Sequence, residues 1–218
     1  MQALYKELQK FGKVKTNEPL AKHTTFKIGG PADFLVIIDS IEQLFALLSY
    51  LDAEGVPYAI FGGGSNMLVS DVGFRGVVIK IMAKEARVEG ETIIADAGCL
   101  TVALAQLSIK EGLTGFELGV GVPGTIGGAV RGNAGAMGKE TKDAVEKIEL
   151  YRDGEIVELS NKACEFGYRT SGIKTLGGTI LRVYLQLSKT TDKTGMKKAL
   201  EHLQYRNKTQ PQGFASTG

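Results

Sequence analysis

The chain has 218 residues, and its 26 lysines and arginines nearly balance its 24 aspartates and glutamates, for a net charge of +2. No basic surface for a polyanion is indicated and no apolar run is long enough to span a bilayer, so we expect neither a nucleic-acid partner nor membrane insertion. Lysines interrupt the apolar residues at the N-terminus, unlike a secretory signal, and a cytoplasmic protein is expected.

Three short apolar runs in the first part of the chain predict buried strands, at 33–38, 58–61 and 76–81. Between the first two, Ser40 begins a predicted helix, with Gln43 at the spacing of a capping box. Gly55 ends this helix and Pro57 prevents its return. The order strand, helix, strand, glycine loop, strand predicts a compact α+β or α/β unit.

Later runs predict strands at 92–97, 147–150, 156–159 and 179–187. A helix is expected over 101–111, with Thr101 as its cap, and a last helix over 195–205. Asp153-Gly154 between two strands is a strong hairpin signal. The region 119–138 fits neither the helical nor the strand period, and we interpret it as a glycine-rich loop. The whole pattern predicts an α+β fold.

The chain has 29 glycines, about twice the ordinary share of about 7 %. Residues 119–124 match the GxGxxG pattern of dinucleotide-binding proteins, but that fingerprint must leave a strand and enter a helix. Because residues 125–128 are expected to continue as loop, we reject the Rossmann interpretation. No CxxC or Cys/His cluster is present, and Cys99 and Cys164 are expected to be buried thiols, so no metal site is predicted.

Two glycine loops are better candidates for an anion site. Residues 62–66, Gly-Gly-Gly-Ser-Asn, follow a predicted buried strand, where backbone N–H groups can converge on a phosphate. Residues 121–128 form a second loop of this kind. A tight turn explains either loop alone equally well. Together, two such surfaces from different parts of the chain could clamp a long diphosphate ligand between two subdomains.

Five motifs in order resemble one family of enzymes, the UDP-N-acetylenolpyruvoylglucosamine reductases. They are residues 24–32 (TTFKIGGPA), 62–66, 121–128, 133–136 (NAGA) and 168–174, which includes Tyr168, Arg169 and Lys174. The resemblance extends from Asn17 to the end of the chain. It implies the FAD-binding fold shared with vanillyl-alcohol oxidase and p-cresol methylhydroxylase, in which two α/β subdomains clamp the cofactor.

The resemblance also implies an activity. In this family NADPH reduces non-covalently bound FAD, which then reduces UDP-N-acetylglucosamine enolpyruvate to UDP-N-acetylmuramate for peptidoglycan synthesis. Carried onto this chain, Arg169 is the expected catalytic cation beside the substrate carboxylate, and Tyr168 and Lys174 are expected substrate residues. The expected cofactor-binding residues are Gly62, Gly63, Gly64, Ser65, Asn66, Gly121, Pro123, Gly124, Thr125, Gly127, Gly128, Asn133, Ala134, Gly135 and Val183.

The family's proton donor, a Ser or Cys, follows a loop that residues 210–218 resemble, and it is expected directly after Gly218. Ser216 is interpreted as a loop residue. We therefore expect three parts: an FAD-binding subdomain at 1–82, a second at 83–190, and at 191–218 a helix and loop leading to an absent substrate domain. The 218 residues alone are expected to bind FAD and to have little reductase activity.

Two alternatives keep flavin binding and change the rest. One is an FAD-linked oxidase of the same fold, although His23 and His202 lie outside the glycine loops and give no covalent flavin link. The other is a flavin-binding module without turnover. The only partner expected is the small UDP-sugar substrate, and the chain is expected to be a monomer.

Overall fold

The structure is a computed structural model that describes residues 1–136 and 138–191, together with 197, 199, 201, 204 and 208. The chain divides into two units. Among the described residues, the first unit comprises Met1–Ala83 with the segment Asp153–Glu155, and the second comprises Lys84–Arg152 and the described residues from Ile156 to Lys208. No helix in the described part of the chain is long and apolar enough to cross a membrane.

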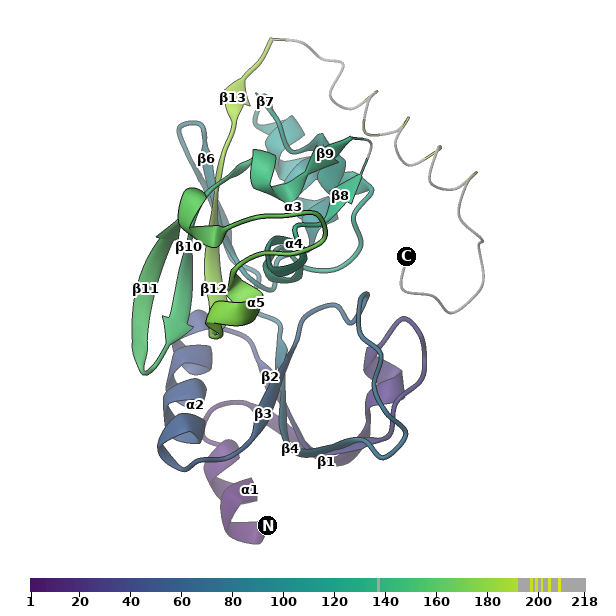
Figure 1. The fold of residues 1–218 in the computed structure, drawn as a ribbon, viewed down its shortest axis with the longest axis vertical. Coiled ribbons are helices and arrows are strands. Elements are labelled where there is room, and N and C mark those ends of the chain that lie inside the picture. The colour runs from purple at the N-terminus through teal and green to yellow at the C-terminus, as the bar shows by residue number, and fades with distance from the viewer. Residues whose placement is uncertain are drawn as a thin grey trace. The chain divides into compact units, whose positions relative to one another are not determined.

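The first unit is built on a four-stranded sheet in the order β1-β2-β4-β3 (Figure 1). Its strands are β1 (Lys13–Pro19), β2 (Pro31–Ile38), β3 (Tyr58–Phe61) and β4 (Phe74–Ile81). β1 is antiparallel to β2, whereas β2, β4 and β3 run parallel to one another. The carboxyl ends of these three strands therefore share one edge of the sheet, the usual place of ligands in α/β units.

Helix α2 (Ile41–Ala53) connects β2 to β3 and packs on β2. The Ser40 hydroxyl accepts from the Gln43 N–H at 3.2 Å, as the capping-box spacing predicted. The Gln43 side chain accepts from the Asp39 N–H instead of that of Ser40. One face of α2 is buried, and burial of each large aliphatic side chain on it stabilises the folded protein by about 1.5–3 kcal/mol. Its members are Ile41, Leu44, Leu47, Leu48 and Leu51.

The second unit is built on a five-stranded sheet in the order β11-β10-β12-β6-β5 (Figure 1). Its strands are β5 (Ala86–Glu89), β6 (Thr92–Asp96), β10 (Val145–Arg152), β11 (Glu155–Ser160) and β12 (Thr179–Gln186). β10 with β12, β12 with β6, and β6 with β5 pair antiparallel. Helices α3 (Thr101–Lys110) and α4 (Ile126–Gly132) contact β6, and α4 also contacts β12.

The predicted hairpin joins β10 to β11. Asp153 and Gly154 both have positive φ, 51° and 84°, which gives the twist that a two-residue hairpin turn requires. The remaining elements are short: α1 (Gln2–Leu8), η1 (Leu20–His23), β7 (Leu113–Thr114), η2 (Glu117–Val120), β8 (Gly135–Ala136), β9 (Lys139–Glu140), η3 (Thr141–Asp143), η4 (Lys162–Cys164), α5 (Ile173–Leu176) and β13 (Ser188–Lys189). The α+β fold class is confirmed.

Two local predictions are wrong. Thr101 is the first residue of α3 and not its cap, because its hydroxyl donates to the Val122 carbonyl instead of accepting from the helix. The region 119–138 is not all loop, since η2 ends at Val120 and α4 covers Ile126–Gly132. Glycines disfavour a helix, but packing of this segment on β6 overrides that propensity. The helix expected at 195–205 lies mostly outside the described residues.

Candidate functional site

The first glycine loop follows β3, and its backbone lies against the residues just before β2. At Gly64 φ is +69°, and a Cβ there would lie 1.9 Å from the carbonyl oxygen of His23. The Thr25 N–H donates to the Gly64 carbonyl at 3.1 Å. Gly63 and Asn66 are exposed. One side of the loop is therefore fixed by the protein, and the other side is open to a ligand.

Three more glycines join the same two segments of the first unit. A Cβ at Gly29 would lie 2.8 Å from the Val69 Cβ, one at Gly30 would lie 2.0 Å from the Asp71 carbonyl oxygen, and one at Gly73 would lie 1.9 Å from the Pro31 carbonyl oxygen. Any side chain at these positions would separate the two backbones. The 24–32 motif thus supports the segment that follows the first glycine loop.

A polar cluster adjoins this support. Glu18 accepts from His23 Nε2 at 3.0 Å and from Lys15 Nζ at 2.9 Å, and the hydrogen bonds to His23 and then Lys15 lower the pKa of its carboxyl. Lys80 Nζ lies 3.1 Å from His23 Nδ1. Because an ammonium only donates, Nδ1 accepts and the proton of a neutral His23 is assigned to Nε2.

The second glycine loop is held on its inner side by the segment between β6 and α3. Thr101 donates through its hydroxyl to the Val122 carbonyl and through its N–H to the Gly124 carbonyl, the latter at 3.2 Å. A Cβ at Gly127 would lie 2.8 Å from the Ala97 Cβ. Gly128 is exposed, and a Cβ there would meet only the Thr125 hydroxyl at 3.6 Å. The open side of this loop is at Gly128.

The opposite end of α4 carries Asn133, which is 0 % exposed. Its Nδ2 donates to the Gly167 carbonyl at 2.9 Å, and its Oδ1 accepts from the Lys142 N–H at 3.1 Å. Gly167 and Thr170 exchange backbone hydrogen bonds of 3.0 and 3.3 Å and so close a tight turn. Tyr168 and Arg169 form the tip of this turn.

Two further contacts fix the turn. The buried Ser171 hydroxyl donates to the Arg131 carbonyl at 2.8 Å, and Lys174 Nζ donates to the Arg169 carbonyl at 2.9 Å. Tyr168 is 85 % exposed and Arg169 is exposed, with φ at +55°. Within the described residues the Arg169 guanidinium makes no hydrogen bond or salt bridge. The pKa of the Glu140 carboxyl is lowered mainly by its hydrogen bond to Lys142, and the charge of Arg169 adds a smaller lowering effect.

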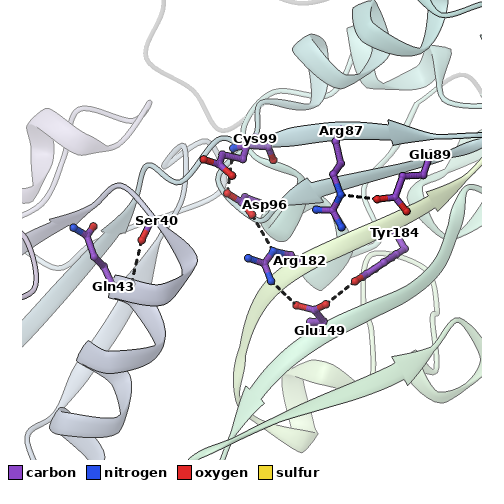
Figure 2. A network of polar contacts seen from close by, with 10 residues as sticks. Ser40, Gln43, Arg87, Glu89, Asp96, Cys99, Glu149, Arg182 and Tyr184 are labelled. Carbon is purple, nitrogen blue, oxygen red and sulfur yellow. Dashed lines mark hydrogen bonds and ion pairs between the residues drawn. The ribbon is translucent and has the colours of Figure 1, made fainter.

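Three strands of the second sheet carry a separate ion-pair network (Figure 2). Arg182 on β12 lies directly opposite both Asp96 on β6 and Glu149 on β10, with N···O distances of 3.3 and 3.2 Å. The Tyr184 hydroxyl donates to Glu149 at 2.6 Å. Burial of the hydroxyl, and to a lesser extent its hydrogen bond to Glu149, raise the pKa of Tyr184 to about 12. Burial raises the pKa of Asp96 above its ordinary value. This network holds the strands in register.

The structure gathers several predicted residues in the second unit. The loop 121–128, Asn133 and the 168–174 segment all lie around α4, whereas residues 62–66 belong to the first unit. The Val183 side chain is fully buried in the core and presents no surface to a ligand. The predicted contact of Val183 with the cofactor stays a prediction. Ala134 and Gly135 are half-buried beside Thr141, which donates to the Ala134 carbonyl at 2.7 Å.

The sequence did not predict that the Ser171 hydroxyl and the Asn133 amide hold the 167–170 turn in place. Their partners are distant in sequence, and no local pattern announces such contacts. Cys99 and Cys164 are buried, and burial raises their pKa to about 12 and about 11. Such thiols are poor nucleophiles. Among the described residues no His, Cys, Asp and Glu side chains form a metal-binding group.

Each unit, taken by itself, offers a glycine loop that fits part of a dinucleotide cofactor. Gly63, Asn66 and Gly128 leave backbone and amide groups open, while the inner sides of both loops are filled by protein. A family model described as an FAD binding domain matches residues 32–160. The fold and this match place the chain in the class of proteins built on the FAD-binding domain.

Comparison with known proteins narrows this class. UDP-N-acetylenolpyruvoylglucosamine reductase of Caldanaerobacter subterraneus subsp. tengcongensis is 43% identical over 98% of this chain and 71% of its own length. The reductase of Bacillus subtilis is 40% identical over 100% of this chain and 74% of its own. The chain belongs to the UDP-N-acetylenolpyruvoylglucosamine reductase family.

Solved structures agree with this assignment. The crystal structure of UDP-N-acetylenolpyruvylglucosamine reductase from Thermus caldophilus matches with a TM-score of 0.81 at 33% identity, over 94% of this chain and 73% of that one. 6-Hydroxy-D-nicotine oxidase from Arthrobacter nicotinovorans matches with a TM-score of 0.63 at 18% identity, over 82% of this chain and 42% of that one, which shows the shared fold alone. The predicted family and oxidase-type FAD fold are confirmed.

Proposed function

We propose that the chain binds FAD non-covalently and takes part in the NADPH-driven reduction of UDP-N-acetylglucosamine enolpyruvate to UDP-N-acetylmuramate. Family membership supports the flavin and the class of substrate. The choice of NADPH as hydride donor, and each residue's role, belong to the proposal. Because the chain spans 71% of the first of these relatives, the proposal for the 218 residues alone is FAD binding.

Two groups of residues would hold the cofactor. The exposed Gly63 and Asn66 would provide the open side of the first loop, with Gly62 and Ser65 as their neighbours, and Gly64 fixes the shape of the loop. The second loop would contribute Gly121, Pro123, Gly124, Thr125, Gly127 and Gly128, followed by Ala134 and Gly135. Bound FAD would accept a hydride from NADPH and deliver one to a vinyl carbon of the enolpyruvyl group, and a proton from the family's expected Ser or Cys donor would complete the reduction at the other carbon.

Arg169 carries the substrate half of the proposal. When a hydride reaches one vinyl carbon, negative charge builds on the other carbon and on the attached carboxylate. An exposed guanidinium can bind that carboxylate with two parallel hydrogen bonds. The single supporting observation is that the turn fixes Arg169 by three tethers while its guanidinium has no hydrogen-bond partner among the described residues. Tyr168 and Lys174 would line the same part of the site.

The test is a titration of the FAD-loaded protein with the enolpyruvyl UDP-sugar, followed through the flavin absorbance. The Arg169→Ala variant should bind the sugar at least about tenfold more weakly, since a charge-assisted bond is worth about 1.5–3 kcal/mol. The FAD affinity should not change. Arg87→Ala removes an exposed arginine on β5 and serves as the matched control. Equal affinity of Arg169→Ala and wild type would contradict the role of Arg169.

A second measurement separates the alternatives. Anaerobic addition of NADPH should bleach the flavin. Because little reductase activity is expected of the 218 residues alone, the enolpyruvyl sugar should bind to the reduced protein and restore its colour only slowly. Bleaching without restoration, together with no binding of the sugar, would favour a flavin-binding module. Reduction by a carbon substrate and reoxidation by oxygen would favour an oxidase.

A further inference from the structure

Asn133 occupies an unusual place at the end of α4. Its φ of 42° lies in the left-handed region, which Asn tolerates better than most residues with a side chain. The residue is 0 % exposed, and a buried carboxamide must have hydrogen-bond partners to avoid a desolvation cost of about 1–3 kcal/mol. The left-handed backbone and the burial together restrict this position to few residue types.

Both ends of the Asn133 carboxamide have such partners. The Nδ2 group donates to Gly167 at 2.9 Å, and Oδ1 accepts from the Lys142 N–H at 3.1 Å. The side chain therefore joins three segments: the end of α4, the η3 segment and the 167–170 turn. With both ends bonded inside the protein and no exposed surface, the side chain has no donor directed at a ligand.

The turn needs this support because of Arg169. A residue with a Cβ pays about 1–2 kcal/mol for a left-handed conformation, and the φ of Arg169 is +55°. The Gly167 carbonyl that accepts from Asn133 also accepts from the Thr170 N–H, so the tether acts at the base of the turn. Ser171 and Lys174 hold the other side of the turn.

We infer that Asn133 is a positioning residue that holds Arg169 ready for the substrate carboxylate, and that its side chain does not touch the flavin. The inference rests on the proposed role of Arg169. It replaces direct cofactor contact as the role of the Asn133 side chain. The inference requires that residue 133 donates a hydrogen bond to the Gly167 carbonyl. A side chain that only accepts from the Lys142 N–H would not hold the turn.

Asn133→Asp keeps the size, the tolerance of positive φ and the acceptor for Lys142. It loses the donor to Gly167 and adds a charge beside Glu140. The pKa of Glu140 is lowered mainly by its hydrogen bond to Lys142, and a hydrogen bond from Asn133 helps to lower it further. If the buried carboxylate of Asn133→Asp prevents folding, Asn133→Gly is used in its place, because Gly also adopts the positive φ of this position. Asn161→Ala is the matched control: Asn161 Nδ2 donates to the Lys142 and Val145 carbonyls at 2.8 and 2.7 Å, so its loss removes two part-buried amide bonds and leaves the Asn133–Gly167 bond in place.

Three quantities are measured in each variant: amide hydrogen exchange at Gly167 and Thr170, FAD affinity, and affinity for the enolpyruvyl UDP-sugar. In Asn133→Asp we expect exchange at Thr170 to accelerate about tenfold and sugar affinity to fall about fivefold to tenfold, as for one lost hydrogen bond. FAD affinity should stay within about twofold of wild type. Asn161→Ala should leave exchange at Thr170 unchanged.

A double-mutant cycle tests whether the effect passes through Arg169. In the Arg169→Ala background, Asn133→Asp should cause no further loss of sugar affinity. Unchanged exchange at Thr170, a full additive loss in that background, or a loss of FAD affinity as large as the loss for the sugar would each overturn the inference. If Arg169→Ala alone has no effect on sugar binding, the proposed function fails, and the exchange data still decide whether Asn133 holds the turn.

Discussion

Gly64 lies directly against the carbonyl oxygen of His23, so closely that a Cβ on Gly64 would be 1.9 Å from that oxygen. The contact joins the first glycine loop to the segment before β2, and Thr25 reinforces it with an N–H···O bond to Gly64. The absence of a side chain here therefore has two effects. It permits φ of +69°, and it lets two backbones touch.

Gly64→Ala separates these two effects when compared with Gly55→Ala. Gly55 also has positive φ, +62°, but a Cβ there would meet nothing within 4 Å. The control should lose about 1 kcal/mol of unfolding free energy from backbone strain, and Gly64→Ala should lose at least about 3 kcal/mol. Urea unfolding measures both. Similar losses in the two variants would contradict the close backbone contact.

Gly127 and Gly128 are neighbours in α4 with opposite surroundings. A Cβ at Gly127 would collide with Ala97, whereas one at Gly128 would make only an ordinary contact with the Thr125 hydroxyl at 3.6 Å. Gly127→Ala should therefore destabilise the protein by about 1–3 kcal/mol. Gly128→Ala should raise the stability of the apoprotein by up to about 1 kcal/mol, because Ala favours a helix over Gly by about that amount, and should weaken FAD binding.

Gly132→Ala is the control for this pair, since Gly132 lies in the same helix with nothing within 4 Å of its Cβ position. Gly132→Ala should change the free energy of unfolding by no more than the helix preference of Ala over Gly, about 1 kcal/mol, and should leave FAD affinity unchanged. Unchanged FAD affinity in Gly128→Ala would show that the open side of the second loop does not face the cofactor.

Two carboxyl groups should give stability a pH dependence of opposite sign. The pKa of Glu18 is lowered by His23 and Lys15, so its contribution is present above the ordinary pKa of about 4.3 and is lost as pH falls through the folded pKa. The pKa of Asp96 is raised by burial, so the folded protein holds that proton more tightly than the unfolded chain. Stability from Asp96 therefore falls as pH rises from about 3.9 through the folded pKa.

Urea unfolding between pH 3 and 7 of wild type, Glu18→Gln and Asp96→Asn tests these signs. The advantage of wild type over Glu18→Gln should grow with rising pH. Its advantage over Asp96→Asn should shrink over the same range. Parallel curves for wild type and a variant would show that the substituted carboxyl has the same pKa in the folded and unfolded chain.

Local signals in the sequence were sufficient for several elements. Ser40 and Gln43 placed the start of α2, and Asp153-Gly154 placed the β10–β11 hairpin, because capping and turn chemistry involve residues close in sequence. β1 gave no such signal. Its residues Lys13–Pro19 are mostly polar and half-buried or exposed, and they form a strand only because β2 is available to pair with them.

The candidate site was predictable as a set of motifs but not as a geometry. In α4, Gly127 packs closely on Ala97, which follows β6 and lies 30 residues earlier in the chain, so helix propensity alone gave the wrong assignment. The same limit applies to Asn133 and Gly167, which meet across 34 residues of sequence. Resemblance identified Asn133 as part of a motif, but only its two hydrogen bonds indicate what the side chain does.

Binding of FAD by this chain without a covalent bond is tested most directly by the absorption spectrum of the purified protein. After saturation with FAD and removal of the excess, the protein should show flavin bands at a ratio of one FAD per chain. Denaturation should release all of the colour as unmodified FAD. A colourless protein after saturation, or yellow colour that stays on the denatured chain, would contradict the account.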